Sequence, residues 1–264
     1  MRDRTLGALA AAAGAGLVAA LLLLRPEVLL AMPLRGSDSA PGRPALPAGL
    51  SDIPLGTPAP PPEGEGGYAL LGTDGDRAVA WDPCRPVRYV VDARTAPPGG
   101  DYLLADALGE VGRLTGLRFQ PDGPTDEVAA DDRLPYQPDR YGDRWAPVLV
   151  TWSDPATHPA LAGDVAAYAG PQAVDGAQPG SRRYVTGQLV VDGPQLAEMV
   201  AGPAGLARAR AVLLHELAHL LGLDHVDDPG QLMYPSTTPL VVDFADGDLR
   251  GLAAVSGGPC FRDF

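Results

Sequence analysis

The segment AVLLHELAHLLGLDHVDDPGQLMYP, residues 211–235, contains the pattern HExxHxxGxxH, which constrains the fold more than any other stretch of the chain. Three of the four histidines in the sequence, His215, His219 and His225, fall within this pattern. Residues four apart lie on the same face of a helix, so the imidazoles of His215 and His219 can reach one tetrahedral cation. The spacing therefore predicts a helix that presents two nitrogen ligands to a single metal ion.

The remaining positions of the pattern predict how the metal site is completed. Gly222 follows His219 by three residues, where helices commonly end in a left-handed conformation that glycine adopts without a steric penalty. The chain can then turn back and bring His225 in as the third ligand. Three neutral imidazoles suit zinc and leave its fourth position open for water, as a catalytic site requires. Glu216 is rotated off the ligand face, so we expect it beside the metal, as the general base that takes a proton from that water.

A short run after the third histidine carries a resemblance to a known family. Leu232, Met233, Tyr234 and Pro235 form the sequence LMYP, in which Met233 lies eight positions after the last histidine. With this run, the motif resembles that of the metzincin zinc metallopeptidases, and within them the matrix-metalloprotease-like matrixins, whose zinc motif ends in a methionine-containing turn. The resemblance implies that Met233 forms an apolar floor under one catalytic zinc ion. It also implies a zinc-dependent metalloendopeptidase acting on protein or peptide substrates.

The resemblance further implies an α+β fold of metzincin type, with a twisted mixed five-stranded sheet, an active-site helix and a small C-terminal subdomain. Local patterns agree with this class. Apolar runs of strand length and apolar residues at helical spacing indicate the secondary structure. Strands are expected at residues 87–92, 117–120, 147–152 and 184–192, an edge strand near 165–169, a hairpin joining 68–71 to 77–81, and helices at 101–115, 194–200, 203–221 and 246–255. Asp101 is a candidate cap for the first helix.

In matrixins the main substrate pocket lies beside the zinc, between the active-site helix and the segment after the methionine turn. The matching residues here are Tyr234, Pro235, Leu240 and Val241, with Leu214 next to the first ligand. None of these side chains carries a charge, so we expect a preference for an apolar residue just after the scissile bond. An extended peptide could add to the predicted edge strand through main-chain hydrogen bonds, which favours internal cleavage.

Two alternative functions remain open from the sequence. One is an extracytoplasmic zinc-containing binding module that holds a partner without turnover, and the presence of Glu216 argues against it, because binding alone requires no base there. The other is a metal-dependent hydrolase of cell-wall peptides. The net charge of −13 makes nucleic acid an unsuitable partner.

The N-terminal part of the chain predicts export. Residues 6–24 carry no charge and follow two arginines, and nineteen apolar residues approach the length that spans a bilayer. We therefore expect residues 1–32 to be an uncleaved membrane anchor, with a cleaved signal peptide as the alternative. Residues 33–67 hold nine prolines and predict a linker. The peptidase domain then covers residues 68–264, and it is extracytoplasmic in either case, anchored to the cell membrane or secreted.

Two further observations concern stabilising links. The only cysteines are Cys84 and Cys260, and in an oxidising compartment such a pair favours a disulfide bond. The alternative, Cys84 as a cap on the zinc, leaves Cys260 unpaired.

A polar stretch at 125–144 is acidic, which indicates a solvated loop or, as the alternative, a calcium site. His158, the fourth histidine, is interpreted as a surface residue.

Overall fold

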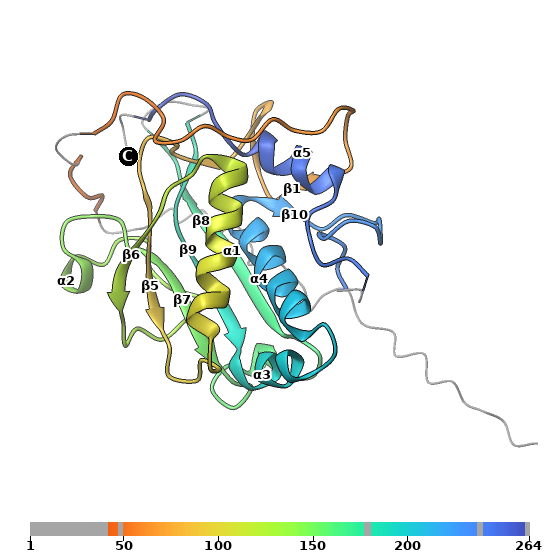
Figure 1. Cartoon of the computed structure of the whole chain (residues 1–264). Helices are drawn as coiled ribbons and strands as arrows, with labels where there is room; N and C mark the ends of the chain where they lie inside the picture. Colours follow the sequence, from red (N-terminus) through yellow and green to blue (C-terminus); the bar gives the residue numbers. More distant parts are fainter. Residues whose placement is uncertain (1–41, 47–49, 177–180, 237–239, 262–264) are drawn as a thin grey trace, which may run out of the picture.

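The computed structural model of the chain describes residues 42–46, 50–176, 181–236 and 240–261 (Figure 1). It contains a mixed sheet with helices on one face, which confirms the α+β class of metzincin type. The sheet strands are β4 (Ala80–Trp81), β5 (Val87–Asp92), β6 (Phe119–Pro124), β7 (Val148–Ser153), β8 (Ala167–Val174) and β9 (Arg183–Asp192). The two-residue β4 makes the sheet six-stranded, where five strands were predicted.

The sheet is parallel except at one edge. β6, β5, β7 and β9 follow one another in that order and run parallel, and β4 pairs in parallel with the start of β9. β8 runs antiparallel to β9 and, in the part of the chain that is described, pairs with no other strand. The central β7 is buried at all six positions, as expected for a parallel strand covered on both faces. The predicted edge strand is therefore confirmed, although it begins two residues later and extends further.

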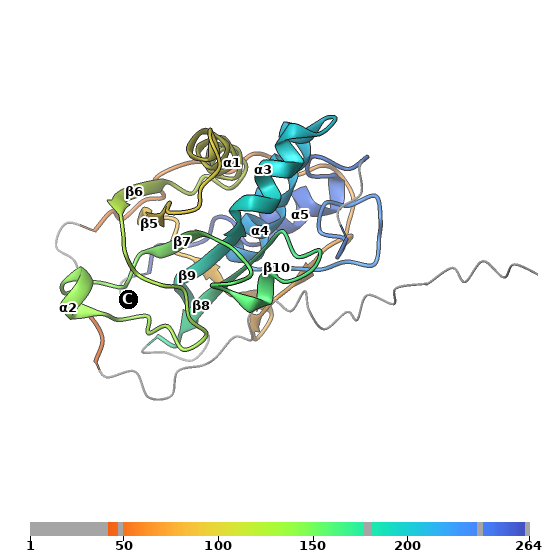
Figure 2. The same ribbon diagram turned by 90° about the horizontal axis from the view of Figure 1, so that it is seen from below.

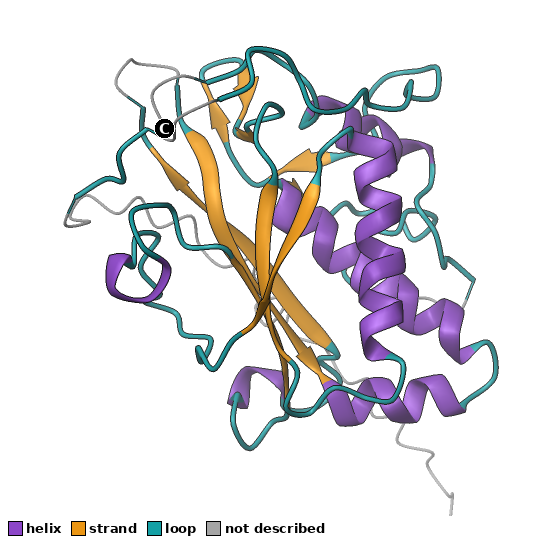
Figure 3. Cartoon of the chain, turned by 60° about the vertical axis from the view of Figure 1, so that its left-hand side comes forward, coloured by secondary structure: helices purple, strands orange, loops and turns teal. Residues whose placement is uncertain are grey.

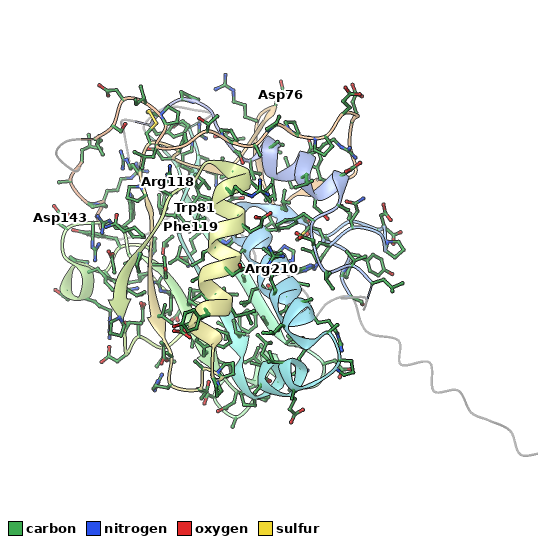
Figure 4. The ribbon with its side chains drawn as sticks, viewed as in Figure 1. Asp76, Trp81, Arg118, Phe119, Asp143 and Arg210 are labelled. Atoms are coloured by element: carbon green, nitrogen blue, oxygen red, sulfur yellow. A yellow bond between two sulfur atoms is a disulfide. The ribbon has the colours of Figure 1, made fainter. Side chains whose placement is uncertain are left out.

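Helices cover one face of the sheet. α1 (Gly100–Thr115) and α4 (Gly205–Leu221) lie side by side over it, and α3 (Gly193–Ala201) connects β9 to α4 (Figures 2 and 3). Arg210 on α4 binds Asp106 on α1, with 2.6 Å between Nε and Oδ2 (Figure 4). The apolar stripe predicted for α1 is its buried face. The predicted cap was wrong: the N-cap residue is Gly99, with φ of 80°, and Asp101 lies inside the first turn.

The opposite face of the sheet is covered by the segment that follows β6, which includes the short α2 (Pro138–Tyr141). A buried ion pair holds this segment. Arg133 Nε lies 2.9 Å from Glu127 Oε1, and its Nη2 lies 3.0 Å from Oε2. Arg133 also donates to the hydroxyl of Thr186 on β9, at 2.8 Å. The acidic stretch thus contains one carboxylate that is buried and bound to a cation of the protein, not exposed to solvent.

The predicted hairpin is only partly present. β2 (Thr73–Asp74) and β3 (Arg77–Ala78) pair around the expected turn. β1 (Ala69–Leu70) instead pairs with β10 (Leu223–Asp224), the strand that follows α4. Turn residues indicate a local reversal, but they do not decide which distant segment an extended arm will join.

Part of the predicted linker lies against the domain formed by the sheet and its helices. Within residues 50–67, Leu55 N donates to Pro83 O and Ala59 N donates to Leu114 O, each at 2.9 Å. Over the described ranges no helix has the length and apolar character needed to cross a bilayer. The predicted anchor or signal peptide, residues 1–32, lies outside the described residues.

Two remaining elements connect the C-terminal part to the sheet. α5 (Asp246–Ala254) is the predicted last helix and packs near the end of α1. Cys84 and Cys260 form the predicted disulfide, with 5.4 Å between their Cα atoms. The bond fastens the segment after α5 to the loop before β5, so the chain beyond the metal motif is tied back to the sheet.

Candidate metal centre

The active-site helix α4 ends where the sequence predicts. Its residues from Ala211 to Leu221 are all buried. Gly222 ends the helix with φ of 112°, and a Cβ there would lie 2.8 Å from the Tyr184 ring. Only glycine combines that backbone conformation with that close approach. Trp81 Nε1 donates to Leu220 O at 2.9 Å, so one orphan carbonyl at the helix end is bound to the sheet.

The three predicted ligands converge on one point. The Nε2 atom of His225 lies 3.1 Å from that of His215 and 3.0 Å from that of His219. A tetrahedral ion with bonds of about 2.1 Å separates its ligand nitrogens by roughly 3.4 Å, so the imidazoles need to part by only a few tenths of an ångström. In the described part of the chain, this is the only set of three or more His, Cys, Asp or Glu side chains that could share a metal ion.

Backbone carbonyls orient two of these imidazoles. His215 Nδ1 lies 2.7 Å from Leu232 O, and His219 Nδ1 lies 2.8 Å from Leu223 O. A carbonyl only accepts, so each Nδ1 carries the proton and each Nε2 turns a lone pair toward the shared point. The tautomers are therefore those that metal binding through Nε2 requires.

Burial keeps the imidazoles neutral. It lowers the pKa of His215 to about 4, against the opposing effect of the hydrogen bond to Leu232. The pKa of His219 is well below its usual value, and that of His225 is lowered, in both cases first by burial. Neutral imidazole is the form that binds a metal ion, so at pH 7 the ligands are ready without losing a proton.

Glu216 lies one residue after the first ligand and is 4% exposed. Burial raises its pKa to about 8, opposed by a hydrogen bond from the backbone N–H of Ala169 on β8. Its Oε2 atom is buried without a hydrogen-bond partner. Burying a polar atom without a hydrogen-bond partner costs free energy. Because Oε2 lies beside the three histidines, we expect it to gain its partner when metal-bound water or substrate is present.

The methionine turn lies in the core and is fastened to α5. Met233 is 1% exposed. The Asp248 carboxylate accepts the N–H of Leu232 at 2.7 Å and that of Met233 at 3.2 Å, and also the N–H of Ala245 at 2.9 Å. Asp248 therefore ties the methionine turn to the start of α5. Leu223 was not singled out from the sequence, because it acts through its backbone carbonyl, which leaves no signature in the side chain.

The predicted pocket residues differ in exposure. Leu214 is fully buried in the core, and Leu240 is 92% exposed. Tyr234, Pro235 and Val241 are partly buried. Residues 237–239, which belong in sequence to the predicted wall segment 234–241, lie outside the described residues. The pocket therefore stays a prediction.

Two other features lie away from the histidines. A cavity of about 560 Å³ lies near the amino ends of β5 and β7, beside Trp81 and Trp145; Cys84 of the disulfide lines it, but none of the predicted metal, catalytic or substrate-pocket residues does. His158 was wrongly interpreted as a surface residue. It is 8% exposed, and its Nδ1 lies 2.6 Å from Ser153 Oγ at the end of β7.

A helix carrying HExxH, a third histidine after a glycine turn and a buried methionine turn in an α+β fold are the features expected from the resemblance to metzincin zinc metallopeptidases. The family comparison agrees with this class: the family model of the matrixins matches residues 167–255, from β8 to the end of α5. The match confirms the resemblance to matrixins over that segment and supports a zinc metallopeptidase in general. A comparison with curated proteins finds no match.

Proposed function

We propose that this chain is a zinc-dependent endopeptidase that hydrolyses extracytoplasmic proteins or peptides. The observation that carries the proposal is the convergence of three neutral imidazoles next to Glu216, a buried carboxylate with one unpartnered oxygen. A structural zinc site has four protein ligands and requires no carboxylate with an unpartnered oxygen beside them. Residues His215, His219 and His225 would hold the metal.

A zinc ion bound there would supply Lewis acidity, which polarises a substrate carbonyl and makes water more acidic. A zinc cation held by the three histidines would favour the ionised form of the carboxylate, so Glu216 would accept the proton of the attacking water on Oε2 and pass it to the leaving amine. The hydrogen bond from Ala169 holds the other side of the carboxylate, so the unpartnered oxygen is the one available to the water. The buried surroundings exclude bulk water that would compete for it.

The edge strand β8 is the proposed seat of the substrate backbone. It pairs on one side with β9, and its register runs from Ala167 opposite Val191 to Val174 opposite Arg183. Main-chain pairing along a strand edge requires an extended segment and no free chain end. This favours cleavage inside a chain over removal of terminal residues.

Selectivity would come from the predicted pocket. Tyr234, Pro235, Leu240 and Val241 are uncharged, and the side chain of Leu240 is 92% exposed and so accessible to a substrate. Burial of a leucine-sized side chain contributes about 1.5 to 3 kcal/mol, which corresponds to roughly tenfold or greater preference over a polar residue. We therefore expect an apolar residue just after the scissile bond.

The test uses the purified chain, zinc analysis and a library of internally quenched peptides. Glu216→Gln should bind zinc as the wild type does and cleave at least about 100-fold more slowly, because the general base is lost. His219→Ala should lose both zinc and cleavage. Zinc binding without cleavage of any peptide by the wild type would favour the binding module. Cleavage confined to cell-wall peptides would favour the second alternative, and wild-type cleavage by Glu216→Gln would refute the proposed mechanism.

The location of the enzyme is a further part of the proposal. An N-terminal anchor at residues 1–32 would hold the peptidase on the outer side of the membrane. Sedimentation of the activity with membranes, and its release only by detergent, is the expected result. Recovery of a soluble mature protein that begins near Met32 would instead show a cleaved signal peptide.

A further inference from the structure

The short strand β10 orients two of the three histidines. It occupies the two residues between Gly222 and His225. The Leu223 carbonyl accepts the Nδ1 proton of His219 at 2.8 Å. Asp224 precedes His225 directly, and its Oδ1 accepts the backbone N–H of that histidine at 2.8 Å. Any displacement of β10 would therefore move the support of one ligand and the backbone of another.

β10 is itself held by β1, its only strand partner among the described residues. Ala69 lies opposite Asp224, Leu70 lies opposite Leu223, and Leu71 N donates to Gly222 O at 2.9 Å. In an antiparallel pair, hydrogen-bonded and non-bonded positions alternate. The bond at Leu71 makes Leu223 a non-bonded position, so its carbonyl points away from β1 and is available to His219.

The orientation of His215, the remaining ligand, depends on the residues just before β1. His215 Nδ1 donates to Leu232 O, and Leu232 N is held by Asp248 on α5. The start of α5 rests on the backbone of Gly67: a Cβ added to Gly247 would lie 2.1 Å from Gly67 O. This close approach seats α5, and with it the support of His215, on the same N-terminal segment.

Arg250 fastens that segment to α5. Its Nε donates to Gly66 O at 2.9 Å, and its Nη1 donates to Glu63 O at 3.1 Å. The N-terminal segment is therefore held by the Arg250 side chain of α5 and by backbone pairing with β10. In sequence, β10 precedes the methionine turn and α5 follows it.

We infer that residues 67–71 are a positioning element of the metal centre, because their backbone fixes the hydrogen-bond partners or the neighbouring residues of all three histidines. The inference rests on the proposed metal site. Loss of such outer partners typically weakens metal binding 10- to 100-fold, since the ligands are no longer held in the binding orientation. The segment would thus be required for zinc affinity although none of its side chains is a ligand.

The test compares two substitutions at one position in the full chain. Leu71→Pro removes the N–H that binds Gly222, whereas Leu71→Ala keeps it and shortens the side chain. Zinc affinity is measured by competition with a chelator, and ligand geometry by the visible spectrum of the cobalt-substituted protein. We expect Leu71→Pro to bind zinc about 10- to 100-fold more weakly with an altered cobalt spectrum, and Leu71→Ala to remain within about threefold of the wild type. Equal zinc affinities in the two variants would overturn the inference.

A second measurement covers the case in which Leu71→Pro does not fold. In the wild type, binding of zinc should slow hydrogen exchange at the Leu71 amide, because coupling between two sites is reciprocal. Arg250→Gln, which removes only the anchor to Gly66 and Glu63, should weaken zinc binding several-fold. Unchanged exchange at Leu71 on addition of zinc would overturn the positioning role. Wild-type zinc affinity in His219→Ala would overturn the proposed metal site as well, so the two failures are distinguishable.

Discussion

Removal of the Glu127 carboxylate charge should destabilise the protein more than any single change at its surface. The Arg133 side chain is 1% exposed and that of Glu127 is 8% exposed, so Glu127→Gln would leave a buried guanidinium without its counter-charge. Breaking a buried pair in this way costs about 3 to 5 kcal/mol. For a domain of this size that corresponds to a fall in Tm of roughly 6 to 20 °C.

The pH dependence has a definite sign. Burial tends to raise the pKa of Glu127, but the hydrogen bonds and charge of Arg133 outweigh it, and the pKa is lowered overall. A lowered pKa in the folded state contributes stability above the unfolded value, near 4.3, and this stability is lost as pH falls through the folded value. The difference in unfolding free energy between wild type and Glu127→Gln should therefore be full at pH 7 and shrink below about pH 4.

The assay is urea and thermal unfolding with two matched controls. Glu110→Gln removes one half of an exposed pair with Arg113 on α1 and should cost less than about 1 kcal/mol. Adding Arg133→Met to Glu127→Gln should recover part of the loss, because no unpaired charge remains. A loss in Glu127→Gln no larger than in Glu110→Gln would refute the reasoning. The calcium alternative for this loop would be favoured if removal of calcium lowered Tm while Glu127→Gln had no such effect.

Three other predictions concern the site and its supports. Asp248→Ala should lower unfolding free energy by about 3 kcal/mol or more, since three backbone N–H groups lose their acceptor, and should weaken zinc binding; calorimetry and chelator competition measure both, and unchanged values would contradict the assigned role. Replacement of both cysteines by serine should lower the free energy of unfolding by roughly 5 kcal/mol in the chain-entropy model. Thermal unfolding measures the effect, and an equal Tm for the oxidised and the reduced protein would contradict it. Leu240→Arg should shift the library profile toward acidic residues just after the scissile bond, and an unchanged profile would remove Leu240 from the pocket.

The metal motif was predictable because its geometry is local. The helix ending at Gly222, and the approach of His225 to His215 and His219, follow from spacing and from the conformational freedom of one glycine. The disulfide followed from the number of cysteines. β5 was predicted to the residue because its valine- and tyrosine-rich run begins directly after Pro86 and ends at the polar Asp92.

Long-range pairings were not predictable in the same way. The arm at Ala69–Leu70 joins β10 and not its neighbour in sequence, since nothing in its two residues specifies a partner more than 150 positions away. His158 lies in a polar, proline-flanked stretch, which favoured exposure, but Ser153 at the end of β7 and the Ala129 carbonyl draw it inward. Glu127 resembled its acidic neighbours until the fold brought Arg133 against it.

The edge strand β8 has an uneven supply of hydrogen-bond donors. In an antiparallel pair the backbone N–H and C=O groups of alternate residues point to the same neighbouring strand. The backbone groups of Ala169 and Pro171 therefore both point away from β9. The N–H of Ala169 is already directed to Glu216, and Pro171 has none. At these two positions the edge can offer only carbonyl oxygens. A peptide added there would be held chiefly through its own N–H groups, so a proline or N-methylated residue in the guest would remove a bond for which the strand has no substitute.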